Sequence, residues 1–425
     1  MLNIAKKLLS VLFLLLQLES YAQGVKFENG SDWKQILAKA RSENKYVFVD
    51  CYATWCGPCK AMDRDVYPDE AVGRNVNDKF IAVKMQMDTS DKDDQAIKNG
   101  YASSHFLMAE YKVLAFPTFL FFSPDGTLVH RGVGYKKSED FLDMSDAALN
   151  PDKQFYSVLN RYKSGKLTPK ECGDFANAAT HLGEKQLGTE AAHVYMDKYL
   201  FTLKDKELFA SKDNLDFIET YANSTTDKGF KLFWKDSAKI NSLLGANVAQ
   251  KKCIMLIVTS DVIPLVEKTK GTPDWTAIEK QETKKYGNLG KIATLQERLI
   301  RTYNLKDWEA FGVAYKAYYE NVGEFNVFYV NGFAWDLFEH TNDQSVLLVA
   351  MKVMARYKNK ENPEEVDTYA NLLYKTGQKD QAIEWEQKAV ELDKQRAAAR
   401  HKEQGPEYPQ TLEKMKTGQP TWPNN

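Results

Sequence analysis

Two cysteines three positions apart, Cys56 and Cys59, are the residues of this chain best placed to do chemistry. At this spacing both sulfurs lie on one side of the start of a helix, so they can form a disulfide within the pair and exchange it with another. The exchange needs one sulfur that is ionised and reachable. Cys56 comes where a short apolar run ends and a helical pattern begins. Unpaired N–H groups and the positive end of the helix dipole at that point favour a thiolate.

Cys56 is therefore the expected nucleophile. Cys59, one turn further into the helix, is expected to be less exposed and to resolve a mixed disulfide by attacking the Cys56 sulfur. Pro58 fits the first helical turn, where its missing N–H costs nothing, and Gly57 leaves the approach to Cys56 open. The alternatives are a structural disulfide and half of a zinc site. Zinc takes four ligands, and no second cysteine pair or paired histidines accompany these two, so we expect neither metal nor cofactor.

The elements that must position this pair alternate between strand and helix. Short β-branched and aromatic runs predict strands, and amphipathic runs between them predict helices. A Pro-Asp-Gly turn at residues 124–126 predicts a hairpin. The expected strands cover residues 46–52, 80–87, 118–122 and 127–131, and the expected helices cover residues 31–40, 56–77, 92–101 and 138–149. Ser31 is the expected cap of the first helix. This order predicts an α/β fold with a mixed sheet flanked by helices.

The hexapeptide Trp55-Cys56-Gly57-Pro58-Cys59-Lys60, with Asp50 six positions before Cys56 and Phe116-Pro117-Thr118 later, resembles the thioredoxin superfamily. The resemblance implies that Asp50 is buried under the site and relays a proton for Cys59, a role that suits a carboxylate of elevated pKa. It implies that Lys84, on the next strand, faces Asp50. The alternatives from the residues alone are a locally hydrogen-bonded Asp50 and a solvated Lys84.

The same resemblance implies a surface for an extended protein substrate. Pro117 matches the family's cis-proline, which lies opposite the cysteines and offers backbone to the substrate; an ordinary edge-strand proline is the alternative. The remaining expected substrate contacts are Trp55, Gly57, Pro58 and Phe116.

Residues 59–63 and 66–69 look most like an exported branch related to the periplasmic domains of disulfide-reducing transducers. This implies protein disulfides as substrates and a membrane electron donor. The resemblance covers residues 27–149, about a third of the chain. Two departures are Cys51, at a strand position that is commonly aromatic, and a long stretch over residues 88–117, whose extra residues near 103–111 affect access to the site. Cys51, Cys172 and Cys253 are most simply buried apolar residues.

The N-terminal residues carry an export signature. Lys6 and Lys7 precede an apolar run over residues 8–16, and small residues stand at Ser20 and Ala22. This pattern predicts a signal peptide cleaved after Ala22 and a periplasmic or otherwise exported protein. A membrane anchor is the alternative, but crossing a bilayer takes about 20 apolar residues and Glu19 interrupts this run. With 57 Lys+Arg against 58 Asp+Glu, the charge does not favour nucleic acid as a partner.

The 425 residues suggest two or three domains at roughly 100–200 residues each. Beyond residue 155 helical periodicity takes over, except for the apolar run at 254–265, which the period alone does not type. Ala370, Gly377, Ala382 and Ala389 resemble a tetratricopeptide helix pair, and a weaker copy with Ala334, Phe338 and Ala355 precedes it. The expected parts are a signal peptide (1–22), a thioredoxin-like domain (23–150), a helical domain (151–325), tetratricopeptide-like pairs (326–400) and a loose tail (401–425).

Two functions of different classes follow. The first is an exported thiol–disulfide oxidoreductase that reduces or exchanges protein disulfides, and its Gly-Pro dipeptide resembles reducing members of the family. The second is a redox-sensing or peptide-binding module in which the helical region dominates, since most of the chain is helical and carries no evident catalytic constellation. The substrate and the direction of exchange are not encoded in the motif, because the electron supply of the compartment decides direction.

Overall fold

The computed structural model describes residues 24–28, 32–323 and 329–423. The predicted signal peptide therefore lies outside the described residues. Within them, no helix combines the length and the apolarity that crossing a membrane requires. The chain divides into two compact units, residues 1–210 and residues 211–425, which are described separately.

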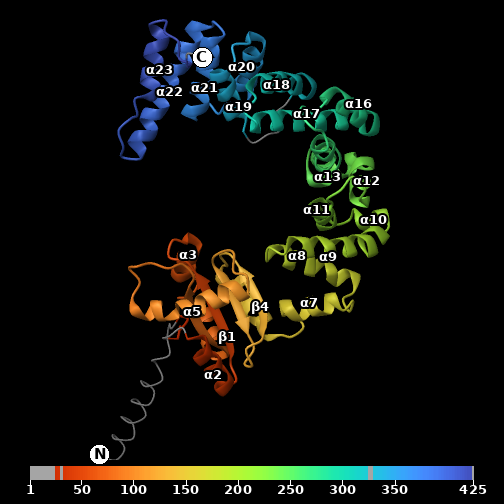
Figure 1. Cartoon of the computed structure of the whole chain (residues 1–425), viewed down its shortest axis with the longest axis vertical. Helices are drawn as coiled ribbons and strands as arrows, with labels where there is room; N and C mark the ends of the chain where they lie inside the picture. The colour runs from red at the N-terminus through yellow and green to blue at the C-terminus, as the bar shows by residue number, and fades with distance from the viewer. Residues whose placement is uncertain (1–23, 29–31, 324–328, 424–425) are drawn as a thin grey trace, which may run out of the picture. The chain divides into compact units, whose positions relative to one another are not determined.

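A four-stranded mixed sheet forms the centre of the first unit (Figure 1). Its strands are β1 (Tyr46–Tyr52), β2 (Phe80–Gln86), β3 (Thr118–Phe122) and β4 (Leu128–Val133), in the order β2-β1-β3-β4. β1 pairs with β2 in parallel, whereas β3 is antiparallel to both β1 and β4. The mixed sheet and the 118–131 hairpin confirm the expected α/β fold.

Helices cover both faces of this sheet. One buried cluster joins α2 (Trp33–Glu43) and α5 (Gln95–Glu110) to one face, through residues such as Ile36, Leu107 and Leu120. The other joins α3 (Gly57–Asp65), α4 (Glu70–Lys79) and α6 (Ser138–Leu149) to the opposite face, through Met62, Phe141 and the aromatic residues of β1 and β3. Alternate residues of each strand thus serve opposite cores, as the two-residue period of a strand requires.

Three helices differ from the sequence prediction. The first begins at Trp33 because Asp32, rather than Ser31, is its N-cap. The helix expected over residues 56–77 is two helices, because Pro68 interrupts it and Asp69 caps the second one. The helix expected over residues 92–101 continues to Glu110 as α5, so the extra residues of this stretch extend the helix up to its C-cap at Tyr111.

Helices follow the α/β fold within the same unit. They are α7 (Phe155–Lys163), α8 (Pro169–His181), α9 (Lys185–Lys198), the short 3₁₀ turn η1 (Leu200–Thr202) and α10 (Asp205–Leu208). α7 packs on β4, and the Phe155 N–H donates to His130 Nδ1 at 2.9 Å. This junction makes the first compact unit longer than its α/β part.

The second unit is helical throughout its described residues. The run at 254–265 that the sequence left untyped is the end of α14, a π-helical turn η2 and the start of α15. The elements are α11 (Lys212–Tyr221), α12 (Lys228–Lys235), α13 (Ser237–Leu244), α14 (Val248–Ile257), η2 (Val258–Val262), α15 (Ile263–Glu267), α16 (Trp275–Tyr286), α17 (Asn288–Asn304), α18 (Trp308–Val322), α19 (Val330–His340), α20 (Gln344–Tyr357), α21 (Pro363–Lys375), α22 (Lys379–Ala399) and α23 (Glu407–Lys416).

The small residues of the repeat-like pattern separate into two groups. Ala370, Ala382 and Ala389 are fully buried in and around the contact of α21 with α22, and Gly377 adopts a φ of 87° in the turn between these helices. In the weaker copy Ala334 and Phe338 are buried but Ala355 is exposed. The tetratricopeptide-like assignment stays a prediction.

The expectation of a loose C-terminal tail is wrong. Residues 407–416 form α23, which packs on α22, and Met415 is 2% exposed. The Trp422 ring packs near Tyr374 and Phe338. An apolar residue every few positions in this polar segment is enough to attach it to the neighbouring helices.

Candidate active site

Cys56 and Cys59 form a disulfide at the start of α3, with their Cα atoms 5.3 Å apart. Cys56 is the N-cap residue of this helix, and the Cys59 N–H donates a hydrogen bond to the Cys56 sulfur at 3.1 Å. Pro58 stands in the first turn, where the helix loses no internal hydrogen bond. The arrangement puts a backbone donor and the positive end of the helix at the sulfur, which is what stabilises negative charge there.

The predicted difference in exposure between the two cysteines is absent in this disulfide form. Cys56 is 3% exposed and Cys59 is 2% exposed. Both pack with Ala53, against the partly buried rings of Tyr52 and Phe116. The sequence prediction of a freely reachable Cys56 is therefore wrong for the oxidised state, because side chains from β1 and the 116–117 segment cover the disulfide.

The surroundings of the disulfide are nevertheless open on one side. Gly57 and Pro58 are exposed, and a Cβ atom built on Gly57 would meet nothing within 4 Å. Trp55 is 70% exposed, with its ring 5.9 Å from that of Phe116. The exposed Trp55 ring and the partly buried Phe116 ring thus border the buried sulfurs.

Asp88 holds the turn that carries Trp55. It follows β2, and its carboxylate accepts hydrogen bonds from the Thr54 N–H at 3.0 and 3.2 Å and from the Thr54 hydroxyl. The Cys56 N–H donates to the Ala53 carbonyl at 3.1 Å, which closes the turn before α3. Asp88 is a functional neighbour that sequence reasoning missed. Its signal was an acidic residue directly after a buried strand.

Asp50 lies in the middle of the sheet, on β1, and is fully buried. Neither of its carboxylate oxygens has a hydrogen-bond partner within the described part of the chain. Burial raises the pKa of Asp50 to about 7, and the positive charge of Lys84 and the Tyr67 hydroxyl act in the opposite direction. The carboxyl can therefore gain or lose a proton near neutral pH.

Lys84 occupies the expected register position but has another ion-pair partner. Its backbone lies opposite Asp50 in the parallel register of β1 and β2. Its ammonium group, however, forms an ion pair with Asp63 of α3. Its Nζ lies 4.8 Å from the centre of the Tyr52 ring. The side chain is only partly buried, so it reaches toward the surface and influences Asp50 through its charge rather than through a salt bridge.

The segment before β3 faces the disulfide through Phe116. The Phe116–Pro117 peptide bond is cis, as the resemblance implied. The Pro117 carbonyl already accepts a hydrogen bond from the Gly134 N–H at 2.8 Å, and the Ala115 carbonyl accepts one from the Thr118 hydroxyl at 2.7 Å. Both oxygens are thus already engaged within the domain.

Two further neighbours of the site, Asp63 and Tyr67, lie in the stretches 59–63 and 66–69 that carry the family resemblance, but their roles were not predicted. Tyr67 is buried beside Asp50 and shares its cluster with Phe48 and Phe141. Asp63 accepts the ion pair from Lys84. Nothing in the spacing of either residue marks it, because both reach the sheet through the packing of α3 and the segment after it.

The other three cysteines are free and buried, as expected. Cys51 lies on β1 next to Asp50, Cys172 lies on α8 and Cys253 lies on α14. Burial raises the pKa of each of these thiols, that of Cys253 to about 12. None of them joins the cluster of Asp336, Glu339 and His340, the group of potential metal-ligating side chains among the described residues.

Comparisons with known proteins agree with this geometry. Residues 33–149 match the family model described as a thioredoxin-like domain. The thiol:disulfide interchange protein DsbD of Pseudoalteromonas atlantica is 31% identical over 116 residues, 27% of this chain and 18% of that protein. Thioredoxin-1 of Drosophila melanogaster is 31% identical over 80 residues, 19% of this chain and 59% of that protein.

A solved structure is also similar. A putative disulphide-isomerase from Bacteroides thetaiotaomicron is 32% identical, covers 30% of this chain and 96% of its own, and has a TM-score of 0.25. The match to the curated relatives spans less than two thirds of their length. The chain thus contains a thioredoxin-like domain with a disulfide-forming Cys56–Cys59 pair, followed by a largely helical region.

Proposed function

We propose that this protein is a thiol–disulfide oxidoreductase that reduces or exchanges protein disulfides through Cys56 and Cys59. One observation carries the proposal: the Cys56 sulfur caps α3 and accepts a hydrogen bond from the Cys59 N–H. A sulfur in this position is stabilised as a thiolate, the form that attacks disulfides. The family match over residues 33–149 supports the same chemistry.

In the reducing direction, the Cys56 thiolate attacks one sulfur of a substrate disulfide. A mixed disulfide forms, and the other substrate sulfur leaves as a thiolate that takes up a proton. The Cys59 thiol then loses its proton and attacks the Cys56 sulfur. This step releases the second substrate thiol and leaves the Cys56–Cys59 disulfide, which an external dithiol must reduce before the next cycle.

Asp50 is the proposed proton acceptor for Cys59. Its burial and its pKa of about 7 allow it to take a proton at neutral pH and release it afterwards. Lys84 acts as a positioning residue, since its charge opposes the effect of burial on the Asp50 pKa. The ion pair with Asp63 fixes where that charge lies.

The proposed substrate surface is the apolar rim formed by Trp55 and Phe116, with Gly57 and Pro58 leaving the other side open. Pro117 contributes the shape of this surface, and its carbonyl oxygen is held by the Gly134 N–H. Phe116 also packs on the cysteines, so we propose that a substrate displaces this ring to reach Cys56.

Export and the electron donor belong to the same proposal. The sequence pattern up to Ala22 and the resemblance to disulfide-reducing transducers support an exported protein that receives electrons from a membrane donor. DsbD, the name of several similar proteins, is described as a thiol:disulfide interchange protein. Reduction is the proposed direction.

The burial of the oxidised cysteines favours a second candidate, in which the domain senses redox state and the helices bind a partner. Alkylation separates the two. In the first case, the reduced full-length protein reacts at Cys56 with iodoacetamide at pH 6.5 much faster than a cysteine in a short peptide does. A rate equal to that of the peptide favours the second candidate.

Trapping tests the enzyme proposal directly. Changing Cys59 to Ser removes the resolving sulfur, so reduced protein should accumulate mixed disulfides with reducible protein substrates. The matched variant with Cys172→Ser should accumulate none, because Cys59 remains. If the Cys59→Ser protein captured no disulfide-bonded substrate even when Cys56 reacts with iodoacetamide, the proposed exchange would be wrong.

A further inference from the structure

A cavity of about 490 Å³ lies where the α/β fold meets the helices that follow it in the first unit. β4 and α6 form one wall, and α7 and α8 form the other. This volume is within the range of small-molecule sites, roughly 300–1,000 Å³. Its lining is more apolar than polar, with Met144, Phe155, Val158, Phe175 and Leu182 as the apolar side chains. None of the candidate active-site residues contributes to it.

Arg131 is the buried cation in this wall, whereas Lys136 is partly buried and Lys153 is exposed. It lies on β4, at the edge of the sheet, and is 8% exposed. Within the described residues no carboxylate forms an ion pair with it, and its Nε has no hydrogen-bond partner. The Tyr156 hydroxyl is its polar neighbour. A buried guanidinium without an acidic partner is costly, and an anionic ligand would remove that cost.

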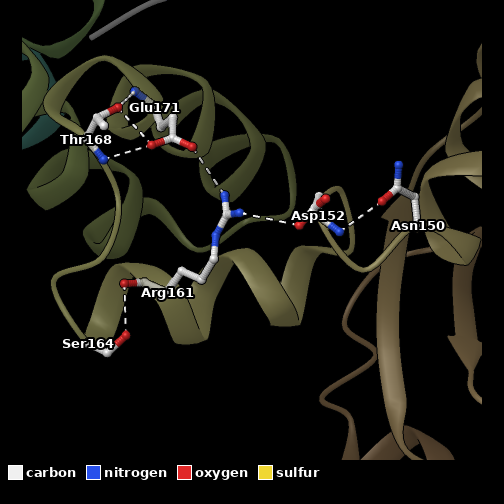
Figure 2. A network of polar contacts seen from close by, with 6 residues as sticks. All are labelled: Asn150, Asp152, Arg161, Ser164, Thr168 and Glu171. Atoms are coloured by element: carbon white, nitrogen blue, oxygen red, sulfur yellow. Dashed lines mark hydrogen bonds and ion pairs between the residues drawn. The ribbon is translucent and has the colours of Figure 1, made fainter.

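The second arginine of the cavity is already neutralised. Figure 2 shows Arg161 of α7 between Asp152 and Glu171, whose carboxylates lie 3.8 and 3.4 Å from its guanidinium. Glu171 is held in turn by Thr168, in the capping box at the start of α8. This network fixes the wall of the cavity and leaves Arg131 as the buried cation to which a ligand charge can bind.

The charges around the cavity indicate how many negative charges a ligand carries. Four cationic side chains line it, and three carboxylates accompany them. His130 adds no charge: it accepts the Phe155 N–H, and burial lowers its pKa to about 4. Counted over its Lys, Arg, Asp and Glu residues, the lining has a formal excess of one positive charge, which a monoanion balances and a dianion exceeds.

We propose that this cavity binds a small organic monocarboxylate with an apolar body, its carboxylate on Arg131 and its body between Phe155 and Phe175. The two rings are 5.8 Å apart and nearly parallel, and they supply the apolar surface. The ligand contacts β4, α7 and α8 together, so it binds the junction between the redox domain and the helices. This site is separate from Cys56 and does not depend on the proposed exchange activity.

Titration calorimetry with two probes tests the proposal on the full-length protein. The probes are 4-phenylbutyrate and its neutral amide, which share one shape and differ in charge. We expect 4-phenylbutyrate to bind at one site per chain, and the amide to bind at least about tenfold more weakly, as the loss of a charge-assisted hydrogen bond predicts. Equal binding of the two probes, or no binding of the carboxylate, would overturn the proposal.

Two variants locate the binding. Arg131→Met should weaken 4-phenylbutyrate by about tenfold or more and leave the amide unchanged. Ala178→Trp should abolish binding of both probes, because Ala178 is an exposed residue of the cavity wall where a large ring fills the space without disturbing the core. Ala102→Trp, at an exposed position of α5 away from the cavity, is the matched control and should bind normally.

The Ala178→Trp result keeps the test decisive if Arg131→Met fails to fold. Binding of 4-phenylbutyrate to Ala178→Trp with unchanged affinity would place the probe elsewhere and overturn the assignment. Normal binding to the Ala102→Trp control together with loss in Ala178→Trp would support it.

Discussion

The redox domain and the last helices each bury carboxyl groups, but in different surroundings. Asp50 is buried without another carboxyl beside it, and the charge of Lys84 partly offsets the increase in its pKa that burial causes. Asp367 of α21 and Glu386 of α22 are buried as a pair, and burial raises both pKa values. The negative charge of Asp367 raises that of Glu386 further. Among the described residues, no lysine or arginine charge offsets the increase in either pKa.

This difference separates a group suited to chemistry from a pair that affects only how stability depends on pH. Asp50 titrates near neutral pH on the strand that leads into the cysteine turn, so its proton can move during exchange. Glu386 keeps its proton at neutral pH because ionisation would bury a second negative charge beside Asp367. A strongly shifted pKa therefore marks a functional site only where a reacting group lies nearby.

Cysteine substitutions should distinguish the two regions by the largest difference in turnover. Cys56→Ser should reduce turnover of disulfide-bonded insulin by at least about a thousandfold, because the nucleophile is lost. Cys253→Ser, in the helical unit, should leave turnover unchanged, since that thiol is buried and burial raises its pKa to about 12. Full activity in the Cys56→Ser protein would remove the basis of the proposed mechanism.

Substitution of the buried carboxyl groups should give the second-largest difference in turnover between the two regions. Asp50→Asn should slow turnover at pH 7 by about a hundredfold, the range of a lost general base. In the unaltered protein the rate should rise with pH as Asp50 loses its proton near pH 7, and the variant should lack this rise. Asp367→Asn is the control and should keep both the rate and its pH profile. A variant of Asp50 with the original pH profile would exclude the proposed relay.

The paired carboxyls should control how stability changes with pH. Their pKa values are higher in the folded chain than in the unfolded one, so the folded state holds more protons and its stability falls as pH rises above about 4.5. Glu386→Gln should remove part of this loss and raise the free energy of unfolding at pH 9 by about 2 kcal/mol, with little change at pH 4. Denaturant titrations at both pH values measure it.

Glu384→Gln is the matched control, an exposed glutamate on the same helix. Its stability should change by less than about 0.5 kcal/mol at either pH. Equal effects of the two variants would show that the net charge of α22, rather than the buried pair, sets the pH dependence.

Helix caps give the smallest effects and show whether the two units unfold separately. Asp69 caps α4 in the first unit and Asp343 caps α20 in the second, each accepting two backbone N–H groups. Either change to Ala should cost about 1 kcal/mol. Proteolysis of the variants should open the first unit in Asp69→Ala and the second in Asp343→Ala. Identical cleavage patterns would indicate one cooperative unit.

Local sequence determined the α/β elements and the cysteine pair. Short β-branched and aromatic runs, a Pro-Asp-Gly turn and the hexapeptide around Cys56 predict the hairpin, the strand before the site and the sulfur at the helix start. These features depend on neighbours within a few residues, so the chain itself contains the information.

Tertiary packing alone decided what surrounds them. Lys84 has the register that the resemblance implied, but α3 supplies Asp63 as its ion-pair partner, and Phe116 covers the sulfurs from a distant segment. The burial of Arg131 in the cavity wall depends on the packing of β4 against α7, and the helical tail depends on the packing of α23 on α22. Such contacts join residues far apart in the chain, and side-chain burial and charge at these points follow from the packed structure rather than from spacing.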